Sequence, residues 1–199
     1  MKIGILKEEK VPADKRVPFS PIQCKEIISN FSHIEIFVQS SNIRCFDDAE
    51  YKYLGIQVVD DISDCDILFG VKEVPKDKLI TNKTYFYFSH TIKKQEYNRD
   101  LLIKMVNLKI EMIDYEVLKS NDRRLLGFGR YAGVIGAYNA FVTLGLKDQS
   151  FSLKAANKCI DRKEMEEEMR KILLTNEKIV VTGKGRVGSG ILEILNKLE

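Results

Sequence analysis

Short apolar runs alternate with amphipathic stretches over the first 115 residues. The apolar runs are bounded by polar or turn residues, which predicts strands; they lie at 2–6, 34–38, 56–59, 66–72, 84–88 and 108–115. Helical periodicity predicts helices in three of the intervals, at 20–31, 47–54 and 94–107. Ser20 followed by Pro21 marks the first of these helices, because serine caps a helix and proline suits its first position. Strands alternating with helices predict an α/β fold, a Rossmann-like domain with a mostly parallel sheet.

The pattern changes after residue 126. Small residues recur at spacings of three and four in 127–147, which predicts a helix, to about Leu146, that packs very closely against another element. A charged amphipathic helix is predicted at 162–174, and its charges indicate a solvated face. A strand at 178–182 and a helix from about Ser189 then predict the start of a second Rossmann domain.

Three segments follow from this pattern. We expect an N-terminal catalytic and substrate domain at 1–147, a connecting helical segment at 148–176, and the start of a truncated NAD-binding domain at 177–199.

Composition and charge exclude several classes of protein. The 32 basic and 29 acidic side chains give a net charge of +3 and form no basic stripe, so no nucleic-acid partner is expected. No apolar run is long enough to span a membrane, and the N-terminus lacks the apolar stretch of a signal peptide. Four cysteines without a CxxC pair indicate reduced thiols in a cytoplasmic protein, and with only two histidines no metal site is expected.

A glycine-rich turn follows the predicted strand at 178–182. The segment is G-x-G-x-x-G, in which Gly183, Gly185 and Gly188 flank Arg186 and Val187. Between a strand and a helix this motif indicates dinucleotide binding, with the pyrophosphate at the helix N-terminus; a tight turn without a ligand is the alternative. The acidic residue that selects NAD is expected about 20 residues further on. We therefore expect a fragment of a longer NAD enzyme, or a short form without a complete cofactor site, and leave NADP open.

Titratable side chains stand at the ends of the predicted strands, where ligands of such sheets bind. Lys72 ends one apolar run and His90 follows another, so both are candidates for acid–base chemistry; a surface lysine and a structural histidine are the alternatives. Arg16, Arg124 and Arg130 lie in or beside loops, where they would either clamp carboxylates or serve as solubilising charges.

Five blocks of sequence carry a family resemblance. They are LKEEKVPADKRVPFSP at 6–21, LFGVKEVP at 68–75, FSHTIKKQ at 88–95, DYEVLKSNDRRLLGFGRYAG at 114–133 and VVTGKGRVGSG at 180–190. In this order they resemble the alanine dehydrogenase, saccharopine dehydrogenase and transhydrogenase-alpha superfamily, and within it most closely the lysine-forming saccharopine dehydrogenases. Such proteins have two Rossmann-like domains with the active site in the cleft between them.

The resemblance implies roles for individual residues. It makes Lys72 and His90 the acid–base pair of a reversible NAD-dependent reaction that interconverts saccharopine with lysine and 2-oxoglutarate. The residues it implies around the substrate are Arg16, Glu73, Glu116 and Arg124. Arg130 departs from the family pattern, because an apolar residue is expected there, and would add a cation near the substrate.

Two alternatives remain at this stage. The first is another enzyme of the superfamily, an alanine dehydrogenase or other opine dehydrogenase. The second is a non-catalytic module that binds an amino acid or an oxo acid. The expected partner is in each case a small amino-acid or oxo-acid molecule, and the sequence leaves open whether the protein is a homo-oligomer.

Overall fold

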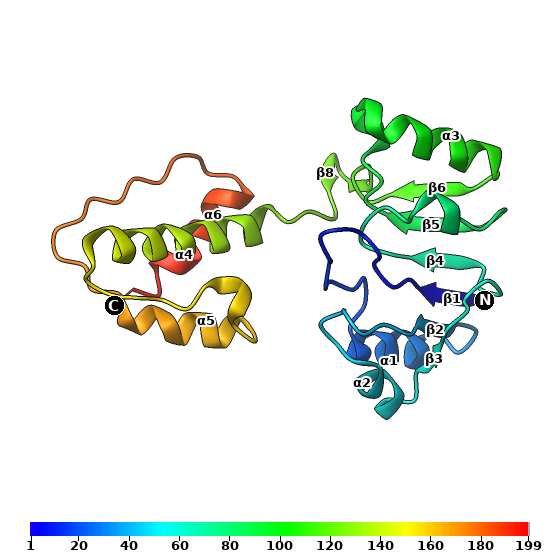
Figure 1. The fold of residues 1–199 in the computed structure, drawn as a ribbon, viewed down its shortest axis with the longest axis horizontal. Coiled ribbons are helices and arrows are strands. Elements are labelled where there is room, and N and C mark those ends of the chain that lie inside the picture. The colour runs from blue at the N-terminus through cyan, green and yellow to red at the C-terminus, as the bar shows by residue number, and fades with distance from the viewer. Residues whose placement is uncertain (199) are drawn as a thin grey trace. The chain divides into compact units, whose positions relative to one another are not determined.

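A six-stranded parallel sheet organises the first of two compact units, residues 1–126, in the computed structural model, which describes residues 1–198. The strands are β1 (Lys2–Ile5), β2 (Glu35–Gln39), β3 (Gln57–Val59), β4 (Ile67–Phe69), β5 (Thr84–Tyr87) and β6 (Glu111–Asp114). Every neighbouring pair is parallel, and in Figure 1 the arrowheads of the sheet all point the same way. The predicted α/β, Rossmann-like class is therefore confirmed.

The order of the strands fixes where a ligand can bind. The order is β3-β2-β1-β4-β5-β6. β2 and β3 therefore lie on one side of β1, and β4, β5 and β6 lie on the other side. This is the strand order of the Rossmann fold, and its crevice lies beyond the carboxyl ends of the two central strands. The loops after β1 and β4 therefore border the expected binding position.

Helices α1 (Pro21–Asn30) and α2 (Asp48–Tyr53) begin at side-chain caps. Ser20 and Gln23 form a reciprocal capping box at the start of α1, as the Ser-Pro sequence predicts, and Asp47 and Glu50 form another at α2. Both helices contribute to one apolar core with the inner strands. Its buried members are Ile3, Ile5, Cys24, Ile36, Val38, Tyr51 and Ile56.

Helix α3 (Arg99–Asn107) contributes to a second apolar core, which includes Leu68, Tyr85, Tyr87, Leu101 and Met105. The helix was predicted from residue 94, and that start is wrong. Two 3-10 turns, Thr91–Lys93 and Glu96–Asn98, precede it.

The reason for the late start is visible in the backbone. Lys94 adopts φ +54°, a left-handed conformation that cannot propagate a right-handed helix.

Strand β4 is shorter than the predicted 66–72. After Phe69 the backbone N–H groups of Val71 and Lys72 donate to the carboxylate of Glu8 instead of a neighbouring strand. The strand therefore stops where a side chain accepts its N–H groups, although the Val71 carbonyl still accepts from the backbone N–H of Phe88.

The second compact unit, residues 127–198 of the described chain, is helical. It contains α4 (Gly129–Asp148), α5 (Arg162–Glu168), a 3-10 turn at Met169–Lys171 and α6 (Arg186–Leu195). None of the helices that the structure describes is both long enough and apolar enough to cross a membrane.

Helices α4 and α6 touch backbone to backbone. A methyl group added at Gly133 would lie 2.0 Å from the carbonyl oxygen of Val187, and one added at Gly190 would lie 2.0 Å from that of Arg130. The small-residue spacing of 127–147 thus does what the sequence predicts, since it lets α4 pack very closely against another element.

Four predictions for the C-terminal part differ from the structure. Residues 178–182 form no strand, because a strand needs a hydrogen-bonded neighbour and none is present in the described part of this unit. The predicted helix at 162–174 is α-helical only to Glu168, and α6 starts at Arg186 instead of Ser189. Helix α4 belongs to the second compact unit, whereas the predicted N-terminal domain, 1–147, included it.

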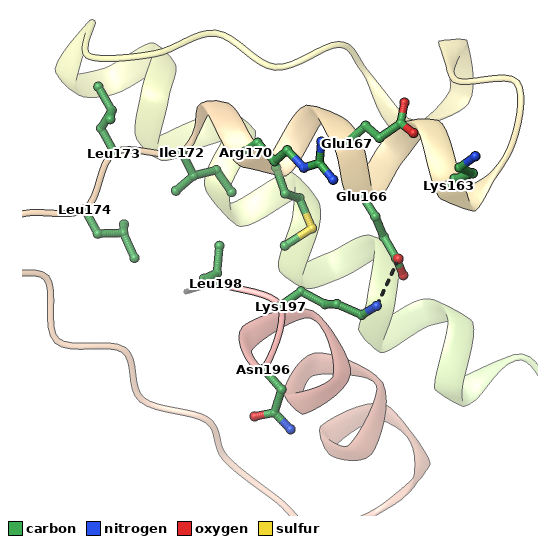
Figure 2. A pocket seen from close by; sticks show the side chains of 11 residues that line it. Lys163, Glu166, Glu167, Arg170, Ile172, Leu173, Leu174, Asn196, Lys197 and Leu198 are labelled. Atoms are coloured by element: carbon green, nitrogen blue, oxygen red, sulfur yellow. Dashed lines mark hydrogen bonds and ion pairs between the residues drawn. The ribbon is translucent and has the colours of Figure 1, made fainter.

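A pocket of about 840 Å³ lies in this unit beside α5 and the end of α6 (Figure 2). The apolar part of its lining consists of Leu173, Leu174 and Leu198. In the polar part, Lys197 Nζ lies 3.2 Å from Glu166 Oε2. None of the residues predicted to act in catalysis or binding lines it.

The close contact between α4 and α6 at Gly133 and Gly190 makes a testable prediction. Gly133→Ala will lower the free energy of unfolding of the second unit by about 1–3 kcal/mol, because the new methyl group meets a backbone carbonyl that cannot move alone. Urea unfolding, with hydrogen exchange of the α4 amides, measures this change.

Gly136→Ala is the matched control on the same helix. Nothing lies within 4 Å of its added methyl group, so this variant will be unchanged or up to about 1 kcal/mol more stable. Equal effects of the two substitutions would contradict the close packing of α4 on α6.

Candidate functional site

A buried carboxylate links the ends of the two central strands. Glu8, just after β1, is 6% exposed, and its Oε1 and Oε2 accept hydrogen bonds from the backbone N–H groups of Val71 and Lys72 at 2.6 and 2.9 Å. Burial raises the pKa of Glu8, although these two hydrogen bonds oppose the rise. The backbone of Lys72 is therefore fixed by the loop after β1.

A second buried carboxylate fixes the backbone after β5 and β6 in the same way. Asp114, the last residue of β6, accepts from the backbone N–H of Ser89 at 3.1 Å, from the Ser89 hydroxyl, and from the backbone N–H of Glu116 at 2.8 Å. His90 follows Ser89 in a left-handed conformation with φ +57°. Asp114 thus holds the residues that present the side chains of His90 and Glu116.

The ends of β4, β5 and β6 bring three predicted residues together. Lys72 Nζ lies 3.4 Å from His90 Nε2, and His90 Nδ1 lies 3.1 Å from Glu116 Oε2. The side chains of His90 and Glu116 are 19% and 12% exposed, so the histidine is largely shielded yet reachable. The result is a lysine–histidine–carboxylate chain at the carboxyl edge of the sheet.

Two cations surround the carboxylate of this chain. Lys93 Nζ lies 3.1 Å from Glu116 Oε1 and 3.0 Å from His90 Nδ1, and Arg124 Nη2 lies 3.9 Å from Glu116 Oε1. Burial would raise the pKa of Glu116, but hydrogen bonds from Lys93 and His90 outweigh it and lower the pKa. Glu116 is therefore held as a carboxylate.

Two neighbours of His90 compete for its Nδ1. Glu116 accepts a hydrogen bond from Nδ1 when that nitrogen is protonated, whereas the Lys93 ammonium, 3.0 Å away, donates to it when it is not. With Nδ1 protonated, Nε2 keeps its lone pair toward Lys72. Lys72 and His90 can in this arrangement pass a proton between them.

Glu73 lies next to this chain, and Lys10 donates to its Oε1. Burial would raise the pKa of Glu73, but the hydrogen bond from Lys10 prevails and lowers it, and His90 contributes in the same direction. The other oxygen, Oε2, is buried without a hydrogen-bond partner among the described residues.

The two predicted arginines of the first unit differ in their pairing. Arg16 Nε donates to Asp14 Oδ1 at 2.9 Å, Nη2 donates to Oδ2, and this pairing lowers the pKa of Asp14. The charge of Lys72 lowers the same pKa, so this ion pair acts within electrostatic reach of the lysine. Arg124 stands on a short hairpin and is 44% exposed.

The hairpin that carries Arg124 was not predicted. It consists of β7 (Lys119–Ser120) and β8 (Arg123–Arg124), joined by Asn121 and Asp122, which both have positive φ. Asparagine and aspartate tolerate this conformation better than most residues, so the Asn-Asp pair was the available indication of a tight turn.

Arg130 lies in the second unit, on α4. It donates to Glu193 through Nε and through Nη2, the latter at 2.8 Å, and together with Arg162 lowers the pKa of Glu193 to about 2. Its predicted place near the substrate stays a prediction.

The glycine-rich turn leads into α6, although the strand predicted before it is absent from the described residues. Gly183 adopts φ +87°, and a methyl group added at Gly188 would lie 2.4 Å from the Gly183 carbonyl oxygen. Gly185 is the N-cap of α6, whose first residues are Arg186 and Val187, and it offers no side chain to the N-terminal N–H groups. The end of the helix is therefore open to an anionic group.

Several residues of the site were not predicted individually. They are Lys10, Asp14, Lys93 and the two buried carboxylates, Glu8 and Asp114. The carboxylates stand at strand ends that the sequence pattern had marked, but nothing in the sequence shows which backbone N–H groups they accept.

Similarity to a known family extends over most of the chain. The model of the family described as "Alanine dehydrogenase/PNT, N-terminal domain" matches residues 4–135. The chain belongs to this family. The predicted superfamily is thereby confirmed.

The similar curated proteins have two names. The mitochondrial alpha-aminoadipic semialdehyde synthase of Bos taurus is 39% identical over 144 residues, covering 71% of this chain and 15% of that protein. The saccharopine dehydrogenase [NAD(+), L-lysine-forming] of Yarrowia lipolytica is 26% identical over 210 residues, covering 97% of this chain and 56% of that protein. The chain thus spans only part of the length of the relatives it matches.

Solved structures support the fold. An L-alanine dehydrogenase aligns with a TM-score of 0.70 at 19% identity, covering 100% of this chain and 53% of that one. The transhydrogenase from Sinorhizobium meliloti aligns with a TM-score of 0.60 at 16% identity, covering 78% and 48%.

The cations around Glu116 make a testable prediction. Lys93→Met will raise the pKa of the Glu116 carboxyl group toward its ordinary value, because the variant removes the hydrogen bond that lowers it most. Carboxyl carbon NMR across an acid titration measures this shift, and Lys94→Met, an exposed neighbour, is the control.

The pH dependence of stability follows from the same shift. Because the folded-state pKa of Glu116 lies below its unfolded value, its contribution is complete above the unfolded pKa and is lost as pH falls through the folded pKa. Lys93→Met will reduce the amount of stability that is lost as the pH falls. An unchanged Glu116 titration in the variant would contradict the proposed ion pair.

Proposed function

We propose that this chain is the N-terminal part of an NAD-dependent amino-acid dehydrogenase that interconverts saccharopine with lysine and 2-oxoglutarate. The observation that carries the proposal is the chain Lys72–His90–Glu116 at the carboxyl edge of the sheet, which starts at β4 beside the switch point. Similarity to proteins named saccharopine dehydrogenase supports the choice of reaction within the family.

Lys72 and His90 would carry the proton steps of this reaction. Interconversion of a secondary amine with an amine and an oxo acid needs a proton added or removed at the nitrogen and at the oxygen of the reacting carbon. Lys72 Nζ and His90 Nε2 lie 3.4 Å apart, so a proton taken by one can be shared with the other. Glu116 orients the imidazole through Nδ1.

The arginines would hold the carboxylates of the substrate. Saccharopine has three carboxylates, and arginine binds a carboxylate through two parallel hydrogen bonds. Arg124 pairs with Glu116 at 3.9 Å and Arg16 pairs with Asp14, so each would exchange a carboxylate partner for the substrate. Glu73 and Arg130 complete the proposed substrate residues.

The second unit would bind NAD through its glycine-rich turn. The close contact between Gly188 and the Gly183 carbonyl, together with an N-cap that has no side chain, fits a pyrophosphate on the backbone of 183–188. When bound, NAD accepts or supplies the hydride of the reaction. NADP remains the alternative cofactor.

The remaining parts of the proposal concern partners and compartment. The partner is a small amino-acid or oxo-acid molecule. The four cysteines are unpaired thiols, which fits a reducing compartment, and we propose the cytoplasm.

The reaction is tested on the protein encoded by the full reading frame that contains this chain. NADH oxidation is followed with lysine plus 2-oxoglutarate and, beside it, with ammonia plus pyruvate. We expect turnover with the first pair, and Lys72→Met and His90→Gln each to reduce kcat by about 10²–10⁴-fold, because each removes an acid–base group.

His33→Gln is the matched control, because His33 is the other histidine of the chain and is exposed away from the proposed site. Turnover with ammonia and pyruvate alone would favour alanine dehydrogenase. A folded protein that binds NADH but turns over neither pair would contradict the proposed reaction.

A further inference from the structure

The carboxylate of Glu8 connects the end of β1 to the loop after β4. Its two oxygens accept the backbone N–H groups of successive residues, Val71 at 2.6 Å and Lys72 at 2.9 Å. Glu8 is 6% exposed, so solvent hardly competes for these donors. The side chain of Lys72 lies 3.4 Å from His90 Nε2. Glu8 is therefore one peptide group away from the proposed acid–base pair.

Both hydrogen bonds depend on the charge of Glu8. Bonds to an ionised acceptor are roughly twice as strong as neutral ones. Protonation also turns one carboxyl oxygen into an O–H donor, which then faces an N–H donor. A protonated Glu8 consequently holds the backbone of Val71 and Lys72 less firmly than an ionised one.

The charged and titratable groups around Glu8 come from three elements. Burial has the largest effect and raises the pKa of Glu8; on its own loop Asp14 adds to the rise and Arg16 opposes it, and these two are paired with each other. At the end of β6 Tyr115 is 8% exposed, and burial raises the pKa of its phenol, which therefore carries no charge at neutral pH. The loop after β4 adds the two N–H groups and the side chain of Lys72, whose charge lowers the pKa of Asp14.

An ionised Glu8 lowers the stability of the folded chain. Its pKa is raised by folding, so its contribution to stability is complete below the unfolded pKa and is lost as pH rises through the folded pKa. A buried charge that costs stability is typical of a functional site. The pKa values of Glu73 and Glu116 are lowered instead, so these carboxylates keep their charge to a more acid pH. Mild acid thus protonates Glu8 first and leaves the chain folded.

We propose that Glu8 is a positioning residue that couples the reaction to pH: ionised, it holds Lys72 beside His90, and protonated, it releases the loop after β4. The acid form is folded, but its Lys72 side chain is no longer fixed against the histidine. The effect on turnover rests on the proposed function, whereas the change in hydrogen bonding needs no substrate.

The hydrogen bonds are tested on the ¹⁵N-labelled chain without substrate. The chemical shift of an amide proton that donates to a carboxylate changes when the carboxylate is protonated. Between about pH 8 and pH 4 the backbone amides of Val71 and Lys72 will titrate together, with one pKa above the ordinary value of a glutamate. The carboxyl carbon of Glu8 will give the same pKa. This titration needs no variant.

Two matched variants assign the titration. Glu8→Gln keeps the shape of the side chain but cannot ionise, so neither amide will titrate. Glu9→Gln is the control, because Glu9 pairs with Lys7 and Lys78 on the surface and not with the backbone of the loop after β4. Its amides will titrate as in the parent chain.

Turnover is measured on the protein encoded by the full reading frame. The kcat/KM for lysine plus 2-oxoglutarate will fall on the acid side with the pKa found for Glu8, since this parameter reports groups of the free enzyme. Glu8→Gln will remove this step from the pH profile and lower kcat at neutral pH by about 10–10²-fold, because a small misplacement of a catalytic group has this effect. Glu9→Gln will change neither.

Several results would overturn the proposal. They are amides of Val71 and Lys72 that do not titrate, amides that titrate in Glu8→Gln as in the parent chain, and a Glu8→Gln enzyme that keeps the acid step of the parent. A lower kcat with that step intact would leave Glu8 a structural role only.

The two proposals can fail separately. Titrating amides in a protein that binds NADH but turns over neither substrate pair would remove the reaction and keep the pH-dependent contact between Glu8 and Lys72. Turnover whose pH profile is the same in Glu8→Gln would keep the reaction and remove its coupling to Glu8.

Discussion

Buried carboxylates that accept backbone N–H groups are the interaction on which the site depends. Glu8 joins the loop after β1 to Val71 and Lys72, and Asp114 joins the end of β6 to the residues around His90. Hydrogen bonds to a charged acceptor are stronger than neutral ones, and the low exposure of both groups strengthens them further. Four strand ends are thereby fixed in two pairs, β1 with β4 and β5 with β6, before any substrate is present.

These contacts also explain the order of the charged groups outward from the sheet. The buried carboxylates bind the backbone, the next layer of His90 and Glu116 binds side chains, and the outer layer of Lys93 and Arg124 meets solvent. A histidine placed in this way has one nitrogen committed to a carboxylate and the other directed to Lys72. Its orientation is determined by three separate strands, as a proton-transferring group requires.

Most of the sheet could be predicted from the sequence, because apolar runs between turns are a direct consequence of strands buried on both faces. The capped start of α1 and the close approach of α4 were equally readable, since Ser20-Pro21 and the glycine spacing act locally. The strand expected at 178–182 does not form, because strand formation depends on a neighbouring strand as hydrogen-bond partner and not on the apolar run itself.

The site was predictable only in part. Lys72, His90 and Glu116 stand at strand ends, and parallel strands bring such ends to one edge, so their meeting follows from topology. The late start of α3 and the hairpin of Arg124 depend on left-handed residues such as Lys94 and Asp122. Lysine gives no local indication of such a backbone.

The place of β1 in the sheet has a consequence for how the protein is made. Among the strands of this sheet β1 leaves the ribosome first, yet it lies between β2 and β4, and β4 follows some 65 residues later in the chain. No hairpin can shelter it in the meantime, since parallel neighbours require long connections. The centre of the sheet must therefore wait, exposed, until β4 has been synthesised, and the nascent chain is most open to association with other chains during that interval.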